Sequence, residues 1–282
     1  MCWRRSTCLA ETYHACTAVL ATRHGKQAVI GPPLSAHAGL RLVVPEDLDT
    51  DCLGTFTGEV PRVTPMRDTA RRKALMGMAA AGLPLGVASE GSFGPHPSIP
   101  FLAAAHELLI FIDAVRGLEI VEERLSPETN FAAIDLAPDA DVDGFLAQAG
   151  FPDHALILRS DAGLVKAITS RTMLDAALRT AQGPARLETD MRAHLNPTRR
   201  GEIGKLAEKL ARRLATPCPA CAAPGFGAVR AERGLPCSDC GAATQLISLL
   251  INGCSLCGHE VSLPRPDGQF FATPAQCPEC NP

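Results

Sequence analysis

The chain has 282 residues, 46% of them hydrophobic, with a formal net charge of −3 at pH 7. This length allows one large domain or a core domain with a smaller one, and the charge does not favour a general nucleic-acid binder. No run of about 18 apolar residues predicts a membrane span, and the charged start lacks the apolar stretch of a signal peptide. We therefore expect a cytoplasmic protein with reduced cysteines.

The first three quarters of the chain predict a mixed α/β fold. After an N-terminal extension over residues 1–16, a domain is expected over residues 17–215. Buried strands are expected at residues 17–22, 40–45, 85–89, 106–113, 117–123 and 155–159. Helices are expected at residues 69–81, near 173–181 and at 196–214. This alternation favours a sheet flanked by helices.

Three polar loops accompany the first strands, at residues 21–27, 49–59 and 89–97. In open α/β sheets, ligands bind at the carboxyl ends of strands, and glycine lets the backbone approach an anion closely. Lys26 is placed to hold phosphate oxygens. Glu90 offers an oxygen ligand of the kind that Mg²⁺ prefers, as do Glu59, Asp49 and Asp51. The loops therefore predict a site for phosphate with Mg²⁺ or Mn²⁺.

Two histidines and a basic helix add candidate ligand contacts. His96, between two prolines, is a candidate acid–base group, although such a histidine more often rigidifies a loop. His24 lies beside Lys26 and is an equally strong candidate. One face of the helix at 196–214 is basic and is either a solvated surface or a phosphate-facing one. On that helix Arg199 or Arg200 would clamp a substrate phosphate.

Four Cys-x-x-Cys pairs occupy the segment 216–282, at Cys218/Cys221, Cys237/Cys240, Cys254/Cys257 and Cys277/Cys280. The first two pairs are separated by 15 residues and the last two by 19, a spacing typical of four-cysteine zinc sites. Each turn presents two thiolates, and two turns complete a tetrahedron, so we predict two structural zinc ions in a double zinc-ribbon-like module. First-with-second and third-with-fourth pairing is the simplest arrangement, and a cross-braced arrangement stays open. His259 is an alternative ligand.

The cysteine-rich segment has little positive charge. It carries Arg230, Arg233 and Arg265 against five acidic residues, and zinc held by four thiolates adds negative charge. Because phosphate binding needs a basic surface, the segment does not favour nucleic acid. We expect it to stabilise the protein or to bind a protein partner or a second copy of the chain.

Four long motifs resemble a bacterial domain family of unknown function that ends in zinc-ribbon-like cysteines. They are Asp49-Thr-Asp with Gly54-Thr-Phe-Thr-Gly-Glu, Ala88-Ser-Glu-Gly-Ser-Phe-Gly-Pro-His-Pro, Glu128-Thr-Asn-Phe, and Glu188-Thr-Asp-Met-Arg-Ala-His-Leu-Asn-Pro-Thr-Arg. The resemblance would cover residues from about 19 to 282 and implies no particular activity.

Residues 17–215 also distantly resemble the inosine/xanthosine triphosphate pyrophosphatases. Leu20-Ala-Thr-Arg-His-Gly-Lys26 is similar to that family's triphosphate loop, with His24 where the family prefers Asn. Lys73-Ala74 precedes Gly82-Leu-Pro by the family's spacing, and Ala88-Ser-Glu90-Gly is similar to its Mg²⁺-binding turn. The family's Ser-His-Arg turn is replaced by Asn196-Pro-Thr-Arg-Arg, and an aromatic set for stacking a base is not evident.

The second resemblance implies a metal-dependent phosphohydrolase that acts on a nucleotide or a related phosphorylated metabolite. Lys26, Glu90 and His96 would then be catalytic, and Glu59 and Glu90 would hold magnesium. Substrate contacts would come from Thr22, His24, Ser89, Arg199 and Arg200. The alternative is a non-catalytic protein that binds a ligand or a protein through its zinc module. The missing Ser-His-Arg turn favours this alternative, whereas the Lys26 and Glu90 motifs favour the hydrolase.

Overall fold

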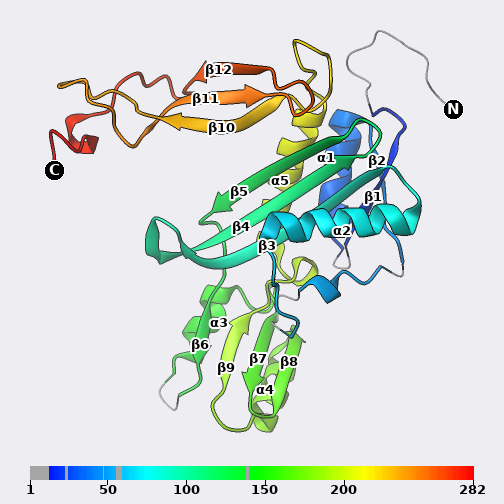
Figure 1. The fold of residues 1–282 in the computed structure, drawn as a ribbon. Helices are drawn as coiled ribbons and strands as arrows, with labels where there is room; N and C mark the ends of the chain where they lie inside the picture. Colours follow the sequence, from blue (N-terminus) through cyan, green and yellow to red (C-terminus); the bar gives the residue numbers. More distant parts are fainter. Residues whose placement is uncertain (1–12, 23–24, 47, 55–58, 138–139) are drawn as a thin grey trace.

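The computed structural model describes residues 13–282 except 23–24, 47, 55–58 and 138–139 (Figure 1). The described strands form three sheets, of five, four and three strands, and helices pack on the first two. The predicted mixed α/β class with a cysteine-rich C-terminal module is confirmed. None of the helices in these residues is long and apolar enough to cross a membrane.

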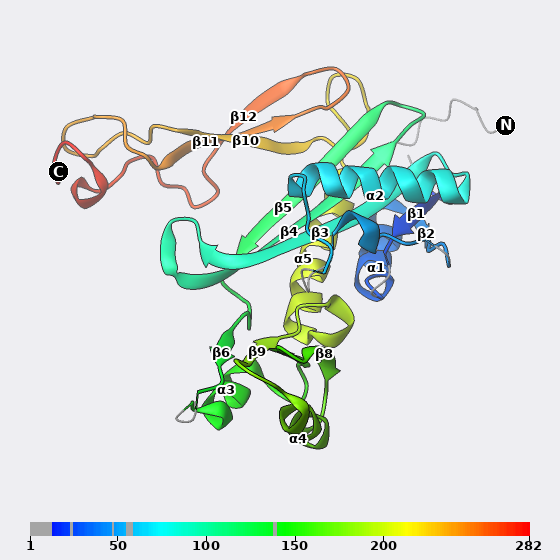
Figure 2. The same ribbon diagram turned by 60° about the horizontal axis from the view of Figure 1, so that its bottom comes forward.

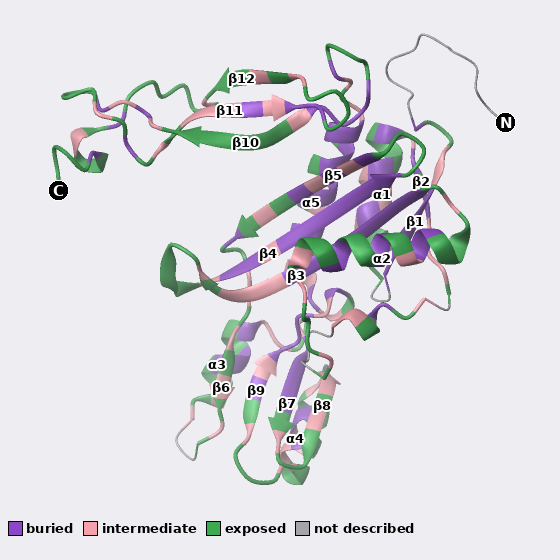
Figure 3. Cartoon of the chain, viewed as in Figure 1, coloured by how far each residue is buried: buried purple, intermediate pink, exposed green. Residues whose placement is uncertain are grey.

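The largest sheet has the strand order β2-β1-β3-β4-β5. Its parallel part consists of β1 (Thr17–Ala21), β2 (Arg41–Val43) and β3 (Leu85–His96), with Ala21 opposite Ala88 at the end of β1. Two further strands, β4 (Ile99–Asp113) and β5 (Leu118–Ser126), continue it in antiparallel pairing. Most of β1 and the second half of β4 are buried, as their apolar runs predict (Figure 3).

Helices cover both faces of this sheet. On one face, α2 (Met66–Ala81) packs Ala70, Ala74 and Met78 against β1, β3 and β4. On the other face lie α1 (Gln27–Ala38) and α5 (Pro197–Leu214), which pack against each other, α1 next to β2 and α5 over β4 and β5 (Figures 1 and 2). The prolines inside α1 explain why the sequence pattern does not predict this helix.

A second, separate sheet, with the order β6-β9-β7-β8, lies between β5 and α5 in the chain. We call residues 127–196 the lower lobe. Its elements are β6 (Ala133–Asp135), α3 (Val142–Ala149), β7 (Leu156–Ser160), β8 (Gly163–Ile168), α4 (Arg171–Thr180), β9 (Arg186–Thr189) and the short helix η2 (Ala193–Leu195). This lobe has its own hydrophobic cluster around Leu156, Leu174 and Leu187. The predicted strand at 155–159 and helix near 173–181 are present, but in this lobe and not on the first sheet.

The C-terminal module begins immediately after α5. Its three antiparallel strands are β10 (Gly227–Arg233), β11 (Ile247–Gly253) and β12 (Glu260–Pro264), in that order across the sheet. Both ribbon views show this narrow sheet extending away from the helices, with the C-terminus at its far end (Figures 1 and 2).

The third predicted loop, residues 89–97, is wrong. Strand β3 continues to His96, because residues from Ser89 to Pro95 pair with Leu109 to Ala103 of β4. The neighbouring strand β4 supplies the backbone hydrogen bonds of this segment. The polar and glycine-rich composition of the segment itself does not indicate a strand. Ser89 and Glu90 therefore lie within a strand.

Candidate functional sites: two cysteine tetrads and a buried ionic cluster

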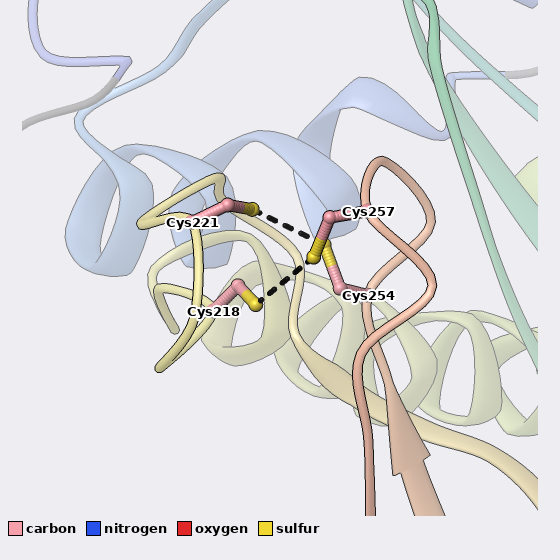
Figure 4. Close-up of side chains that lie close together, drawn as sticks. All are labelled: Cys218, Cys221, Cys254 and Cys257. Carbon is pink, nitrogen blue, oxygen red and sulfur yellow. Dashed lines mark hydrogen bonds between the residues drawn. The ribbon is translucent and has the colours of Figure 1, made fainter.

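Eight cysteine side chains gather into two groups of four. The proximal tetrad, beside the end of α5, is Cys218, Cys221, Cys254 and Cys257 (Figure 4). The distal tetrad, at the other end of the narrow sheet, is Cys237, Cys240, Cys277 and Cys280. Within each tetrad the sulfur atoms all lie within 4.8 Å of one another.

The sulfur positions fit a tetrahedral metal ion. The Sγ atoms of Cys218 and Cys257 are 3.7 Å apart, as are those of Cys221 and Cys254. A Zn–S distance of about 2.3 Å gives tetrahedral edges of about 3.8 Å, whereas a disulfide needs about 2.05 Å. The distal separations, 3.8 and 3.7 Å, match equally well. Four sulfur ligands leave no open coordination position, so both sites fit structural zinc.

Local backbone geometry presents the thiols. In the first pair the N–H of Ala222 donates to the carbonyl oxygen of Cys218 (2.9 Å), and the N–H of Ala220 points at the Cys218 sulfur (3.4 Å). Burial opposes ionisation of this thiol, but the N–H groups of Cys221 and Ala220 prevail and lower the pKa of Cys218 to about 7. The backbone thereby favours the thiolate that a metal requires.

The tight turn requires a positive φ directly after three of the second cysteines. Ala222, Gly241 and Gly258 have φ values of 59°, 71° and 72°. Glycine adopts this conformation without strain, so Cys-x-x-Cys-Gly is a local signature of these turns.

The simplest pairing of the cysteines is wrong, and the cross-braced alternative is confirmed: the first pair joins the third, and the second joins the fourth. Strand β10 leads away from the first pair, and antiparallel β11 returns the chain to the same end. The apolar run at residues 246–251 was the signal for this returning strand. His259 is outside both tetrads, and its ring stacks on Phe226 at 6.1 Å.

A second candidate site lies where β1 ends. Beyond Ala88, strand β3 continues along β4 after its β1 partner has stopped at Ala21. Side chains from five elements converge there. We call them the ionic cluster, which consists of Lys26, Lys73, Ser89, Glu90, Glu107 and Arg199, all buried.

Lys26 enters the cluster from the start of α1. Its Nζ donates to Ser89 Oγ at 2.7 Å, and the residue is 5% exposed. Burial, followed by the nearby Arg199 guanidinium, lowers the pKa of Lys26 to about 7, although Glu107 and Glu90 oppose this change. Lys26 is therefore a lysine whose charge depends on what else occupies the site.

Glu90 faces the opposite side of the sheet. Its Oε1 forms an ion pair with Lys73 of α2, and its Oε2 lies 3.7 Å from Nη1 of Arg62. The same Arg62 nitrogen donates to the Gly91 carbonyl oxygen at 3.2 Å. Lys73 is close but is not aligned for a hydrogen bond, so Oε1 has no hydrogen-bond partner among the described residues.

Arg199 and Glu107 form the most buried ion pair of the cluster. Arg199 Nε donates to Glu107 Oε1 at 2.6 Å, and its Nη2 lies 3.3 Å from Oε2. Nη1 donates to the carbonyl oxygen of Met191, and the guanidinium lies over the ring of Phe93 at 5.1 Å. A Cβ on Gly91 would come within 2.6 Å of Arg199 Nη2 and 2.7 Å of Glu107 Oε2, so only glycine fits beside this pair.

A pocket of about 400 Å³ lies between β3 and the lower lobe. Glu90, Gly91 and Arg62 line one side, and Arg186, Glu188 and Thr189 of β9 line the other. The rings of Phe93 and Phe131, also in the lining, stack at 6.0 Å with 29° between their planes. The sequence shows no aromatic set because these two residues meet only through the fold.

The structure brings three of the predicted site residues, Lys26, Ser89 and Arg199, together on one side of the sheet, and places Glu90 on the other side. Thr22, also buried, directly follows β1. His96 lies six residues along β3 from Glu90, about 20 Å at strand spacing, where its Nδ1 accepts from the N–H of Ser98.

Two other predicted contacts lie elsewhere. Glu59 forms an ion pair with Lys166 of β8, and Arg200 is exposed next to the buried Arg199. His24 lies outside the described residues. Among the described residues, only the two tetrads gather three or more potential metal-ligating side chains. A magnesium ion near Glu90 would therefore need ligands from water and substrate, as Mg²⁺ commonly has.

His194 is a further candidate site residue, and no local pattern in the sequence indicates it. A Cβ on Gly25 would lie 3.8 Å from the Cβ of His194, so η2 sits over the loop that leads to Lys26. Partial burial and then the Arg192 guanidinium lower the pKa of His194 below its usual value. Only the fold places His194 beside this loop.

The basic face of α5 is largely neutralised within the molecule. Lys209 and Arg213 both pair with Glu122, while Lys205 pairs with Glu128 and Glu202, and Arg212 with Glu208. These contacts tie the helix to its own protein. Lys205, Lys209 and Arg212 are exposed, as the solvated-surface alternative expects, whereas Arg213 is buried.

One comparison with known proteins identifies the family of the chain. A family model whose description is "Domain of unknown function (DUF6671)" matches residues 73–282. The chain belongs to this family. The DUF6671 match begins at Lys73 and includes β3, the lower lobe, α5 and both tetrads, whereas Lys26 precedes it. No curated protein matches the chain.

Proposed function

We propose that this DUF6671 protein hydrolyses a small phosphorylated metabolite, such as a nucleotide, in the pocket beside the ionic cluster. The observation that carries the proposal is the charge of the cluster. It buries three basic side chains, Lys26, Lys73 and Arg199, against two carboxylates, Glu90 and Glu107, and Lys26 is the one without a carboxylate partner of its own among the described residues. Because an unpaired buried charge is costly, such a site favours an anionic ligand.

One cation lines the pocket and a second lies behind it. Arg62 lines the pocket, and Lys73 lies behind it on Glu90. Burial, followed by the Arg199 charge, lowers the pKa of Lys26, and a phosphate bound nearby would favour its charged form. The Arg199 guanidinium donates to Glu107 and Met191 and lies over the ring of Phe93, so Arg199 stabilises the cluster and positions Phe93.

Glu90 supplies the carboxylate. It lines the pocket, where a carboxylate oxygen suits a divalent cation or an attacking water, and its Oε1 also forms an ion pair with Lys73. A bound Mg²⁺ or Mn²⁺ would neutralise phosphate charge and lower the pKa of a ligated water. Phe93 and Phe131 provide an apolar wall for the part of the substrate that carries no phosphate.

The test is a phosphate and pyrophosphate release screen with zinc-loaded protein. The panel includes inosine and xanthosine triphosphates, other nucleotides and sugar phosphates, each with Mg²⁺ or Mn²⁺. Glu90→Gln should lower the rate by about 100-fold or more, as expected for loss of a transition-state contact. Glu123→Gln, an exposed carboxylate of β5 paired with His106, is the matched control. Full activity in a folded Glu90→Gln protein would overturn the assignment.

One observation favours a second function, non-catalytic ligand binding. Both carboxylates of the cluster already face a cation, Glu90 facing Lys73 and Glu107 facing Arg199. A silent panel, with pyrophosphate binding retained, would replace hydrolysis with binding. The zinc module would then be the candidate surface for a protein partner or a second copy of the chain.

A further inference from the structure

The proximal tetrad is attached to the main sheet through one buried arginine. Arg213, near the end of α5, donates from Nε to the carbonyl oxygen of Gly225 at 3.0 Å. Its Nη1 donates to Val121 O at 3.2 Å and to Glu122 Oε1 at 2.8 Å, both on β5. One side chain therefore joins the loop after the first cysteine pair to an edge strand of the sheet.

Close packing reinforces this attachment. Gly225 has a φ of 89°, and a Cβ there would overlap Ile120, which belongs to the main hydrophobic cluster. Phe226 packs with Cys218 and Cys254 themselves in a small buried cluster. The loop that carries two ligands of the proximal site is thus in direct contact with the core beneath it.

The distal tetrad has contacts of a different kind. The N–H of Ser238 donates to Ala272 O, the N–H of Ala272 to Pro236 O, and that of Thr244 to Leu235 O. All of these partners belong to the C-terminal module itself. In Figure 1 this end of the module projects away from the α/β part, and Phe270 and Phe271 beside it are 68% and 61% exposed.

We propose that the two metal ions have different roles. The proximal ion is a structural part of the α/β fold, because the segment it fixes is bonded through Arg213 and Gly225 to β5. The distal ion is independently exchangeable, because its loss disturbs only contacts within the far end of the module. This inference is separate from the proposed hydrolase function.

The first test titrates the zinc-loaded full chain with a strong chelator, while zinc release and amide hydrogen exchange are measured together. We expect release in two steps. The first step should raise exchange in residues 234–246 and 265–282 and leave β5 protected. The second should raise exchange in β5 and in the end of α5. Simultaneous release of both ions, with one change across all these segments, would overturn the proposal.

Two matched substitutions assign the steps. Cys257 and Cys280 are each the exposed second cysteine of their pair, one in each tetrad. Cys257→Ser should lower the melting temperature of the α/β part by about 5 °C or more, whereas Cys280→Ser should leave it within about 1 °C. Equal effects of the two substitutions would contradict different roles.

Arg213→Lys tests the connection itself. Lysine keeps the charge but has no planar fork for three partners at once. We expect this variant to retain both zinc ions, while chelation of the proximal ion has less effect on β5 exchange than in the wild type. An unchanged effect on β5 would show that Arg213 does not connect the site to the sheet.

Discussion

Each cysteine tetrad takes its ligands from two four-residue turns, whereas the ionic cluster takes its side chains from α1, α2, β3, β4 and α5. In a tetrad, each pair is prepared by its own backbone turn, and a metal ion joins two such turns. In the cluster, Lys26 meets Ser89, Lys73 meets Glu90, and Glu107 meets Arg199 only when the whole sheet and its helices are in place.

Local and non-local sites therefore differ in what destabilises them. A tetrad depends on a metal ion, whose binding free energy is also folding free energy. The cluster depends on charge balance in a buried place, where removal of one partner leaves another unpaired. We therefore expect removal of the metal ions to destabilise the C-terminal module strongly. We expect substitutions that remove a charge at Lys26, Glu90 or Arg199 to change the stability of the ionic cluster strongly.

The largest expected effect is loss of the metals. Structural zinc in small modules is worth about 10–16 kcal/mol in apparent binding free energy, so complete chelation should unfold the C-terminal module. Elemental analysis should find two zinc ions per chain, and a thiol reagent should count eight additional reactive cysteines after chelation. Iron, or disulfides between the paired cysteines, would contradict the tetrahedral sites.

Removal of Arg199 should be the most damaging single charge substitution in the cluster. Arg199→Leu leaves Glu107 buried without its partner and should lower the free energy of unfolding by about 3–5 kcal/mol in urea titrations. The neighbouring exposed Arg200→Leu serves as the control, with an expected change within about 0.5 kcal/mol. Similar losses of unfolding free energy in both variants would mean that the ion pair between Arg199 and Glu107 does not stabilise the cluster.

Lys26 should give the cluster a measurable pH dependence. Its pKa falls from 10.5 to about 7 on folding, so between these values the unfolded chain binds a proton that the folded chain lacks. Stability from this residue is therefore lowest below pH 7 and rises with pH through the window, by about 1.4 kcal/mol per pH unit. The measurement compares urea unfolding of wild type and Lys26→Met at pH 7 and pH 9. Parallel curves for the two proteins would contradict the shift.

A smaller effect is expected at Gly91. A methyl group there would press on Arg199 and Glu107, so Gly91→Ala should lower the free energy of unfolding by about 1–3 kcal/mol. Gly94, three residues along the same strand, has no atom within 4 Å of its would-be Cβ. Gly94→Ala should change stability much less. Reversed effects would show that the gap beside the ion pair is not tight.

The sequence predicts the local features of both sites better than the connections between them. All eight cysteine ligands follow from Cys-x-x-Cys spacing, but their cross-braced pairing depends on the direction of β10 and β11. Lys26 is predicted from its loop, and Glu90 from a predicted loop that is in fact part of β3. Glu107 is not predicted, because it sits in an apolar strand whose pattern predicts only burial. A carboxylate in such a run is itself a signal that a buried cation lies opposite.

Other residues depend on distances that no local pattern contains. Phe93 and Phe131 stack because the lower lobe folds back against β3. His96 shares a motif with Glu90, yet the long hairpin of β3 and β4 carries it along the strand away from the cluster. Along a strand, each residue adds about 3.3 Å, so residues that are close in sequence can still be far apart in space.

The proposed function requires that the pocket beside the ionic cluster binds a phosphate group. Calorimetric titration of the zinc-loaded protein with pyrophosphate tests it most directly, with Arg62→Gln as the pocket variant and Arg67→Gln, exposed on α2, as control. The account predicts binding to the wild type, about tenfold weaker binding to Arg62→Gln, and no change in Arg67→Gln. Absence of binding to folded wild type, or equal binding to all three proteins, would contradict it.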